Sequence, residues 1–193
     1  MLAPRATSAT SANSSRLVLA ACALLAEIGH LGWEYTHGGV SAHHLLNNPE
    51  LPAISNWWGL LVLPLLVWFL VGRVQRRGAS LMQPGSRERF RTLARLRFAV
   101  ALLWGAALAV AFSLGHPAVN WIFFAAFAAA VVIHVYRDEY VLGFALGMSF
   151  TFGAILPVLV AAVIAACSFA LHLLYGAVLR LTRGGRARGA GLP

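Results

Sequence analysis

A succession of apolar stretches constrains this chain more than any other feature of its sequence. A helix that crosses the hydrocarbon core of a bilayer needs about 20 mostly apolar residues. The stretches cover residues 17–36, 57–72, 98–115, 119–136 and 140–179. The last stretch would be about 60 Å long as one helix, twice the thickness of the core, so it must contain two spans. We place the break at 153–157, because Pro157 suits the first turn of a new helix.

Composition points to the same class of protein. Of the 193 residues, 60% are hydrophobic and 11% are charged, and the mean hydropathy is +0.74, which lies outside the usual balance of a soluble domain. We therefore predict an all-α, polytopic membrane protein with six transmembrane helices in residues 17–181. Residues 1–16 are rich in Ser, Thr and Ala without acids, which predicts a disordered tail. Residues 182–193 form a second, basic tail.

The basic residues indicate how the chain is oriented. All 15 are arginines; eight lie in the loop 73–97, four follow Leu179, and none lies in 37–56 or 115–118. Cytoplasmic loops carry an excess of basic residues, so both termini and the loop 73–97 are expected in the cytoplasm. This predicts a multi-pass protein of a bacterial inner membrane. No nucleic-acid partner is expected, because the arginines do not line one helix with interleaved aromatic residues.

Two further patterns suggest surfaces for partners. In the loop 73–97, Phe90, Leu93 and Leu96 alternate with arginines at near-helical spacing, which is typical of an amphipathic helix lying on anionic inner-leaflet lipids. Gly143 and Gly147 form a GxxxG pair, which favours close helix packing. The pair predicts a tight packing face in the fifth helix and offers a contact for a homo- or hetero-oligomer.

The first apolar stretch also carries a polar stripe. Glu27, His30, Glu34 and His37 fall within about 80° of one helix face. Counting from Arg16 at the inner edge, Glu27 should lie near the middle of the bilayer. Ionisable residues at such a depth are costly to insert, so they face the protein interior and mark function by default.

Histidines in the following loop extend this stripe. Gly38 and Gly39 allow a sharp reversal of the chain, which would fold the loop histidines back over the stripe. Imidazole and carboxylate are ligands for a divalent metal such as Zn, Fe or Cu. The predicted metal ligands are His30, Glu34 and His37, and either His43 or His44 completes the shell from the loop. Glu27 is the predicted catalytic residue, as a general base or as a partner that orients a metal ligand, in a metal-dependent, membrane-embedded enzyme that acts on a lipid or another membrane-resident substrate.

Other functions use the same side chains. In a small metal or proton-coupled permease, Glu27 would be the gate that loads and releases a proton or cation. A non-catalytic assembly subunit needs the polar stripe only for packing.

Histidines at two depths also permit a b-type haem electron carrier. Its ligands would be His37 with His116 near the outer side, or His134 with His172 near the inner side. The sequence also offers His134 a nearby partner. Asp138 follows it by four residues, the helical spacing at which a carboxylate can orient an imidazole by hydrogen bonding.

Overall fold

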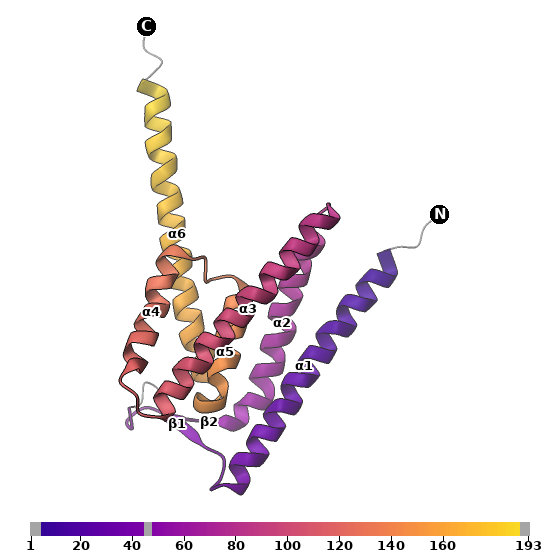
Figure 1. Ribbon diagram of the computed structural model, residues 1–193, viewed down its shortest axis with the longest axis vertical. Helices are drawn as coiled ribbons and strands as arrows, with labels where there is room; N and C mark the ends of the chain where they lie inside the picture. Colours follow the sequence, from indigo (N-terminus) through magenta and orange to yellow (C-terminus); the bar gives the residue numbers. More distant parts are fainter. Residues whose placement is uncertain (1–4, 45–47, 190–193) are drawn as a thin grey trace.

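The computed structural model describes residues 5–44 and 48–189. Within these ranges the chain is all-helical apart from one short hairpin, and successive helices run in alternating directions (Figure 1). The ends of the two predicted tails, residues 1–4 and 190–193, lie outside the described residues. Four of the helices are long and apolar enough to cross a membrane. They are α1 (Arg5–Thr36), α2 (Gly59–Ala79), α3 (Pro84–Ser113) and α6 (Ile155–Gly189).

The other two helices are shorter. α4 (Ala118–Val132) and α5 (Asp138–Phe152) have 15 residues each, or about 22 Å, against about 30 Å for the hydrocarbon core. The predicted break between the last two helices is confirmed. α5 ends immediately before Gly153, whose φ of +67° suits glycine, and α6 begins at Ile155.

The hairpin closes one end of the molecule. α1 ends at Thr36, ahead of two glycines with φ of +125° and +103°. Strand β1 (Ala42–His44) then pairs antiparallel with β2 (Ala53–Ser55), so that His43 stands opposite Ile54. A 3-10 helix, η2 (Asn56–Trp58), leads directly into α2. We call this the hairpin end; the starts of α1 and α3 lie at the opposite end, the arginine end (Figure 1).

Three helices at the arginine end are longer than predicted. Residues 5–16, expected as a disordered tail, are the first turns of α1. The amphipathic helix expected to lie on the membrane surface is instead continuous with the third apolar stretch, in the single helix α3 of 30 residues. The reason is local: Pro84 starts that helix, and no residue that strongly breaks a helix follows Gly85. α6 likewise runs on into the predicted basic tail, to Gly189.

Glycines bring α3 and α5 into close contact. A Cβ on Gly143 would overlap the carbonyl oxygen of Phe98, and one on Gly147 would overlap that of Leu102. Gly105 of α3 faces the same seam, where a Cβ would lie 2.5 Å from the carbonyl oxygen of Phe144. The tight packing face predicted from GxxxG is therefore confirmed, and it is used inside the chain. A contact with a second chain through α5 stays a prediction.

Candidate functional site

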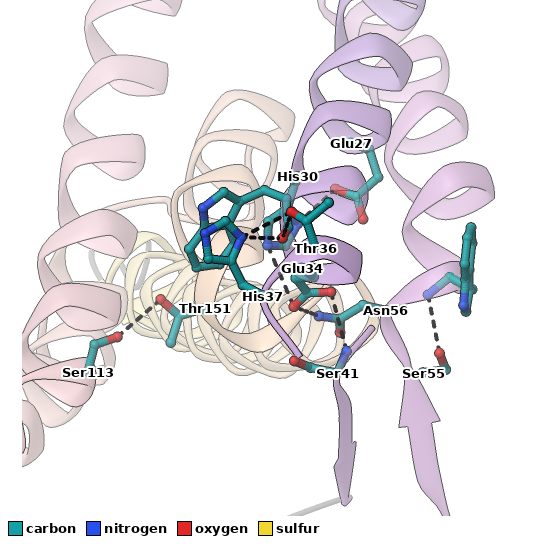
Figure 2. Close-up of polar contacts among 12 residues, drawn as sticks. Glu27, His30, Glu34, Thr36, His37, Ser41, Ser55, Asn56, Ser113 and Thr151 are labelled. Carbon is teal, nitrogen blue, oxygen red and sulfur yellow. Dashed lines mark hydrogen bonds and ion pairs between the residues drawn. The ribbon is translucent and has the colours of Figure 1, made fainter. Parts of the chain in front are cut away.

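The polar face of α1 forms a buried group of three side chains, the α1 cluster, which consists of Glu27, His30 and Glu34 (Figure 2). Their spacing in the sequence places them on one face of the helix. His30 Nδ1 lies 3.6 Å from Glu27 Oε2, and His30 Nε2 lies 3.8 Å from Glu34 Oε1. The side chains of Glu27, His30 and Glu34 are 4%, 7% and 8% exposed. The shared face predicted for these three residues is confirmed.

The imidazole of His30 therefore stands between two carboxylates. Its ring also packs against Phe150 of α5, with 4.7 Å between the ring centroids. A neutral imidazole has a single N–H and can donate it to one carboxylate, whereas a protonated imidazole can donate to both. The arrangement can accept a proton on one side of the ring and release one on the other.

Glu27 is the incompletely paired member of the cluster. Its Oε1 is buried and has no hydrogen-bond partner among the described residues. The side chain lies against Gly59, where a Cβ would overlap Oε1. Gly59 is the first residue of α2 and follows Trp57 and Trp58, so Glu27 lies nearer the hairpin end than its distance from Arg16 predicts. The register of α1 against α2 sets this depth.

Glu34, in contrast, is fully engaged. Its Oε1 accepts a hydrogen bond of 2.8 Å from Asn56 Nδ2, and its Oε2 accepts one of 3.3 Å from the backbone N–H of Ser41. Asn56 is 3% exposed, donates its own backbone N–H to the Ser41 carbonyl at 2.9 Å, and packs against Gly153. Asn56 is not among the site residues predicted from the sequence. Its position directly before the two tryptophans was the available signal.

His43 faces this network from β1. Its Nε2 is buried without a hydrogen-bond partner among the described residues. Burial lowers the pKa of His43, and the negative charge of Glu34 opposes that shift. The neutral imidazole is therefore the form that this position accommodates best.

The other two predicted ligands lie elsewhere. His37 stacks on Trp33, with ring centroids 4.7 Å apart, and its Nδ1 lies 2.8 Å from the Trp33 carbonyl oxygen. His44 Nδ1 lies 2.7 Å from the carbonyl oxygen of Leu51. His37 leaves the predicted face because α1 ends one residue before it. His43 and His44 are adjacent in a strand, where successive side chains point to opposite faces, so only one of them can face Glu34.

The predicted set of metal ligands is thus not brought together. The structure brings His30 and Glu34 together and places His43 near them, while His37 and His44 bind backbone carbonyls. Across residues 5–44 and 48–189, no group of three His, Cys, Asp or Glu side chains is arranged to hold a metal ion.

The histidines considered for haem also have other neighbours. The rings of His134 and His172 contact each other directly, with centroids 4.0 Å apart, which leaves no room for a porphyrin between them. His172 Nδ1 lies 2.8 Å from the Ser168 carbonyl oxygen. At the outer end, His116 Nδ1 accepts a hydrogen bond from the backbone N–H of Ala118 at 3.1 Å.

A second charged group ties α2 to α5 at the arginine end. Arg73 Nε lies 3.0 Å from Asp138, and Arg77 Nη2 lies 3.0 Å from Asp138 and 2.9 Å from Glu139. Both acids are buried, at 6% and 3% exposure. Asp138 therefore pairs with arginines from a distant helix and not with His134, as its sequence spacing had predicted.

Comparison with known proteins adds no functional information. No family model matches the chain, and neither the curated proteins nor the solved structures contain a match. What the site does therefore has to follow from its own geometry.

Proposed function

We propose that this chain is a proton-coupled permease of a bacterial inner membrane, in which the α1 cluster binds and passes the proton. The proposal includes six membrane crossings, with the arginine end in the cytoplasm and the hairpin end outside. The distribution of arginines supports this orientation. Trp57 and Trp58 at the start of α2 support it too, because indole rings prefer the membrane interface.

The position of His30 between two buried carboxylates carries the proposal. In the proposed transfer, His30 Nε2 accepts a proton on the Glu34 side, and Nδ1–H gives its proton to Glu27 Oε2. Glu27 is the final proton acceptor of this relay, because an ionised carboxylate with an unpaired, buried oxygen bears a large desolvation cost. A proton on Glu27 removes that cost.

An apolar layer separates Glu27 from the arginine end. It consists of Val67, Leu70 and Leu142, packed against Ala20 and Ala23 of α1. Protons that reach Glu27 from the hairpin end are held back by this layer, so the described conformation corresponds to a state closed on the arginine side. Small residues at a helix contact permit close approach and sliding, so we place the conformational change at the α1–α2 contact.

The test is charge movement after a rapid pH jump. The purified chain would be reconstituted on a solid-supported membrane, and the transient current would be recorded when the pH drops. The intact protein should give a current that Glu27→Gln and His30→Phe each reduce at least tenfold. Glu50→Gln is the matched control, because Glu50 is an exposed acid in the hairpin loop and its replacement should leave the current unchanged. An undiminished current in Glu27→Gln would exclude the relay.

A metal-dependent enzyme is the second proposal, and one observation favours it. His43 Nε2 is buried, has no partner among the described residues, and belongs to the strand beside Glu34. A modest shift of β1 would bring His43 to His30 and Glu34 as a third ligand, with Glu27 as the general base. Elemental analysis of the purified chain beside His30→Ala/His43→Ala tests it. Stoichiometric metal that the double substitution removes would support the enzyme, and metal-free protein that still moves charge would favour the permease.

A further inference from the structure

An apolar cavity of about 130 Å³ lies among α3, α4, α5 and α6. Its walls include Val100 and Trp104 of α3, Ala129 of α4 and Phe144 of α5. Val100 is 48% exposed and Trp104 is 37% exposed, so the cavity opens on the apolar flank of the molecule. A dry cavity of about 150 Å³ with such a lining is large enough to bind benzene. This one accommodates a short length of hydrocarbon chain.

The walls of the cavity are held by specific contacts. Trp104 Nε1 donates a hydrogen bond of 3.2 Å to the carbonyl oxygen of Ile122, which ties α3 to α4. The buried hydroxyl of Ser168 in α6 donates to the carbonyl oxygens of Ala130 and Ile133, at 2.9 and 3.2 Å. The bonds from Ser168 hold the end of α4 against α6. The chain that follows α4 then lies at the rim of the cavity.

Basic side chains gather at that rim. Ile133 and Val135 both line the cavity, and His134 between them contacts the ring of His172. His134 also lies within the electrostatic reach of Arg137 and Arg97. Among the described residues, no acid lies within ion-pair distance of Arg97 or Arg137.

The two nearest acids in the sequence are already occupied. Asp138 and Glu139 follow Arg137 directly; Asp138 pairs with Arg73 and Arg77 of α2, and Glu139 pairs with Arg77. A net positive charge therefore remains at the mouth of a predominantly apolar cavity, on the flank of a helix bundle.

We propose that the cavity and its basic rim bind one anionic phospholipid, with an acyl chain in the cavity and the phosphate at Arg97, Arg137 and His134. Guanidinium groups bind phosphate oxygens through paired hydrogen bonds. Basic pockets between membrane helices on the cytoplasmic side are typical sites for anionic headgroups. The site lies among α3 to α6, so it does not depend on the α1 cluster or on the permease proposal.

The test compares thermal unfolding of the delipidated full chain in detergent with three additives. These are phosphatidylglycerol, phosphatidylcholine with the same acyl chains, and inorganic phosphate. Saturating phosphatidylglycerol should raise the Tm by about 3–6 °C, the expected scale for a ligand well above its Kd in a chain of this size. Phosphatidylcholine should raise it much less, because its headgroup has no net charge, and inorganic phosphate should not raise it measurably.

Matched substitutions separate this site from general effects of charge and size. Arg97→Gln/Arg137→Gln should abolish the phosphatidylglycerol shift, whereas Arg89→Gln/Arg91→Gln, at exposed arginines of the same helix, should keep it. Ala129→Leu partly fills the cavity and should reduce the shift. Ala128→Leu adds the same volume at an exposed neighbouring position and should not.

Three outcomes would overturn the proposal. An equal shift with inorganic phosphate would indicate an anion site without an acyl chain. An equal loss in Arg89→Gln/Arg91→Gln would indicate diffuse surface electrostatics. A shift that Ala129→Leu and Ala128→Leu affect alike would exclude the cavity as the binding site.

Discussion

Gly59 shows how strongly the α1 cluster depends on a single missing side chain. Its backbone has ordinary helical angles, φ −58° and ψ −36°, so alanine could adopt them without strain. The reason for glycine here is space, because a Cβ would overlap Glu27 Oε1. The buried position of Glu27 is therefore set jointly by two residues from different helices.

Gly59→Ala should lower the free energy of unfolding by about 1–3 kcal/mol, the usual range for overpacking a tight contact. The loss should shrink when Glu27→Ala is combined with it, because the clash disappears with the longer side chain. Chemical unfolding of the two single variants and the double variant measures this coupling.

Two glycines of α1 supply the controls for that experiment. A Cβ on Gly29 or Gly32 would meet nothing within 4 Å, so Gly29→Ala and Gly32→Ala should be neutral or stabilise by up to about 1 kcal/mol. Additive effects of Gly59→Ala and Glu27→Ala would contradict the proposed contact.

His43 should make the stability of the protein depend on pH. Burial lowers its pKa below the ordinary 6.5, and the charge of Glu34 only partly opposes this. Below pH 6.5 the unfolded chain binds more protons at His43 than the folded chain does, so the free energy of unfolding rises with pH in that range. The stability that depends on a neutral His43 is therefore fully present above pH 6.5 and is lost as the pH falls below it.

We therefore expect the Tm of the intact protein to fall more between pH 7.5 and pH 5.5 than that of His43→Gln. His44→Gln should retain the fall, because His44 is exposed and its ring binds the Leu51 carbonyl. Identical pH profiles for the intact protein and His43→Gln would show that His43 does not titrate in this window.

At the scale of elements, ion pairs and glycines set which helices lie together. α5 packs on α3 through Gly105, Gly143 and Gly147, and its first turn is held by arginines of α2. The charged turn at 137–139 therefore connects two helices that are far apart in the sequence. Removing the arginines should cost more than removing one acid, because the acids are the buried partners.

Arg77→Ala should lower the free energy of unfolding by about 3 kcal/mol, toward the lower end of the range for breaking a buried ion pair, because Arg77 is itself partly exposed. Asp138→Asn should cost less, since it leaves behind no buried charge of its own. Arg76→Ala is the control, because Arg76 is the exposed neighbour of Arg77 in α2 and its replacement should change the free energy of unfolding by no more than about 0.5 kcal/mol. Thermal or denaturant unfolding in detergent compares the three, and equal effects of Arg76→Ala and Arg77→Ala would contradict the pairing.

At the scale of the whole molecule, the arginine end and the hairpin end should lie on opposite sides of the membrane. Single cysteines can test this in a background with Cys22→Ser and Cys167→Ser. Glu50→Cys in the hairpin loop should react with a membrane-impermeant maleimide in intact cells. Gln83→Cys, ahead of α3, should react only after the cells are opened.

The shorter helices make this test informative about the number of crossings. If α4 and α5 do not cross, the chain has four crossings, which also places its two ends on one side. His134→Cys, between α4 and α5, distinguishes the cases, because six crossings place it on the same side as Gln83→Cys and four crossings place it on the same side as Glu50→Cys.

Local patterns in the sequence were enough to predict the positions of the helices and the polar face of α1. Apolar stretches marked the helices, because a chain in a hydrocarbon environment must satisfy its own backbone hydrogen bonds. The helical period placed Glu27, His30 and Glu34 on one face, since the face follows from angle per residue alone. The break near Gly153 and the packing role of Gly143 likewise needed only the neighbouring residues.

The partners of these side chains depended on contacts between distant segments, which no local period encodes. The end of α1 at Thr36 removed His37 from the polar face, and the strand geometry of β1 turned His44 away from His43. Asn56 forms a hydrogen bond with Glu34, 22 positions away in the sequence, and Asp138 forms one with Arg73, 65 positions away. The register of one helix against another selects such pairs, and that register is decided by the packing of whole helix faces, where glycines admit close approach and larger side chains forbid it.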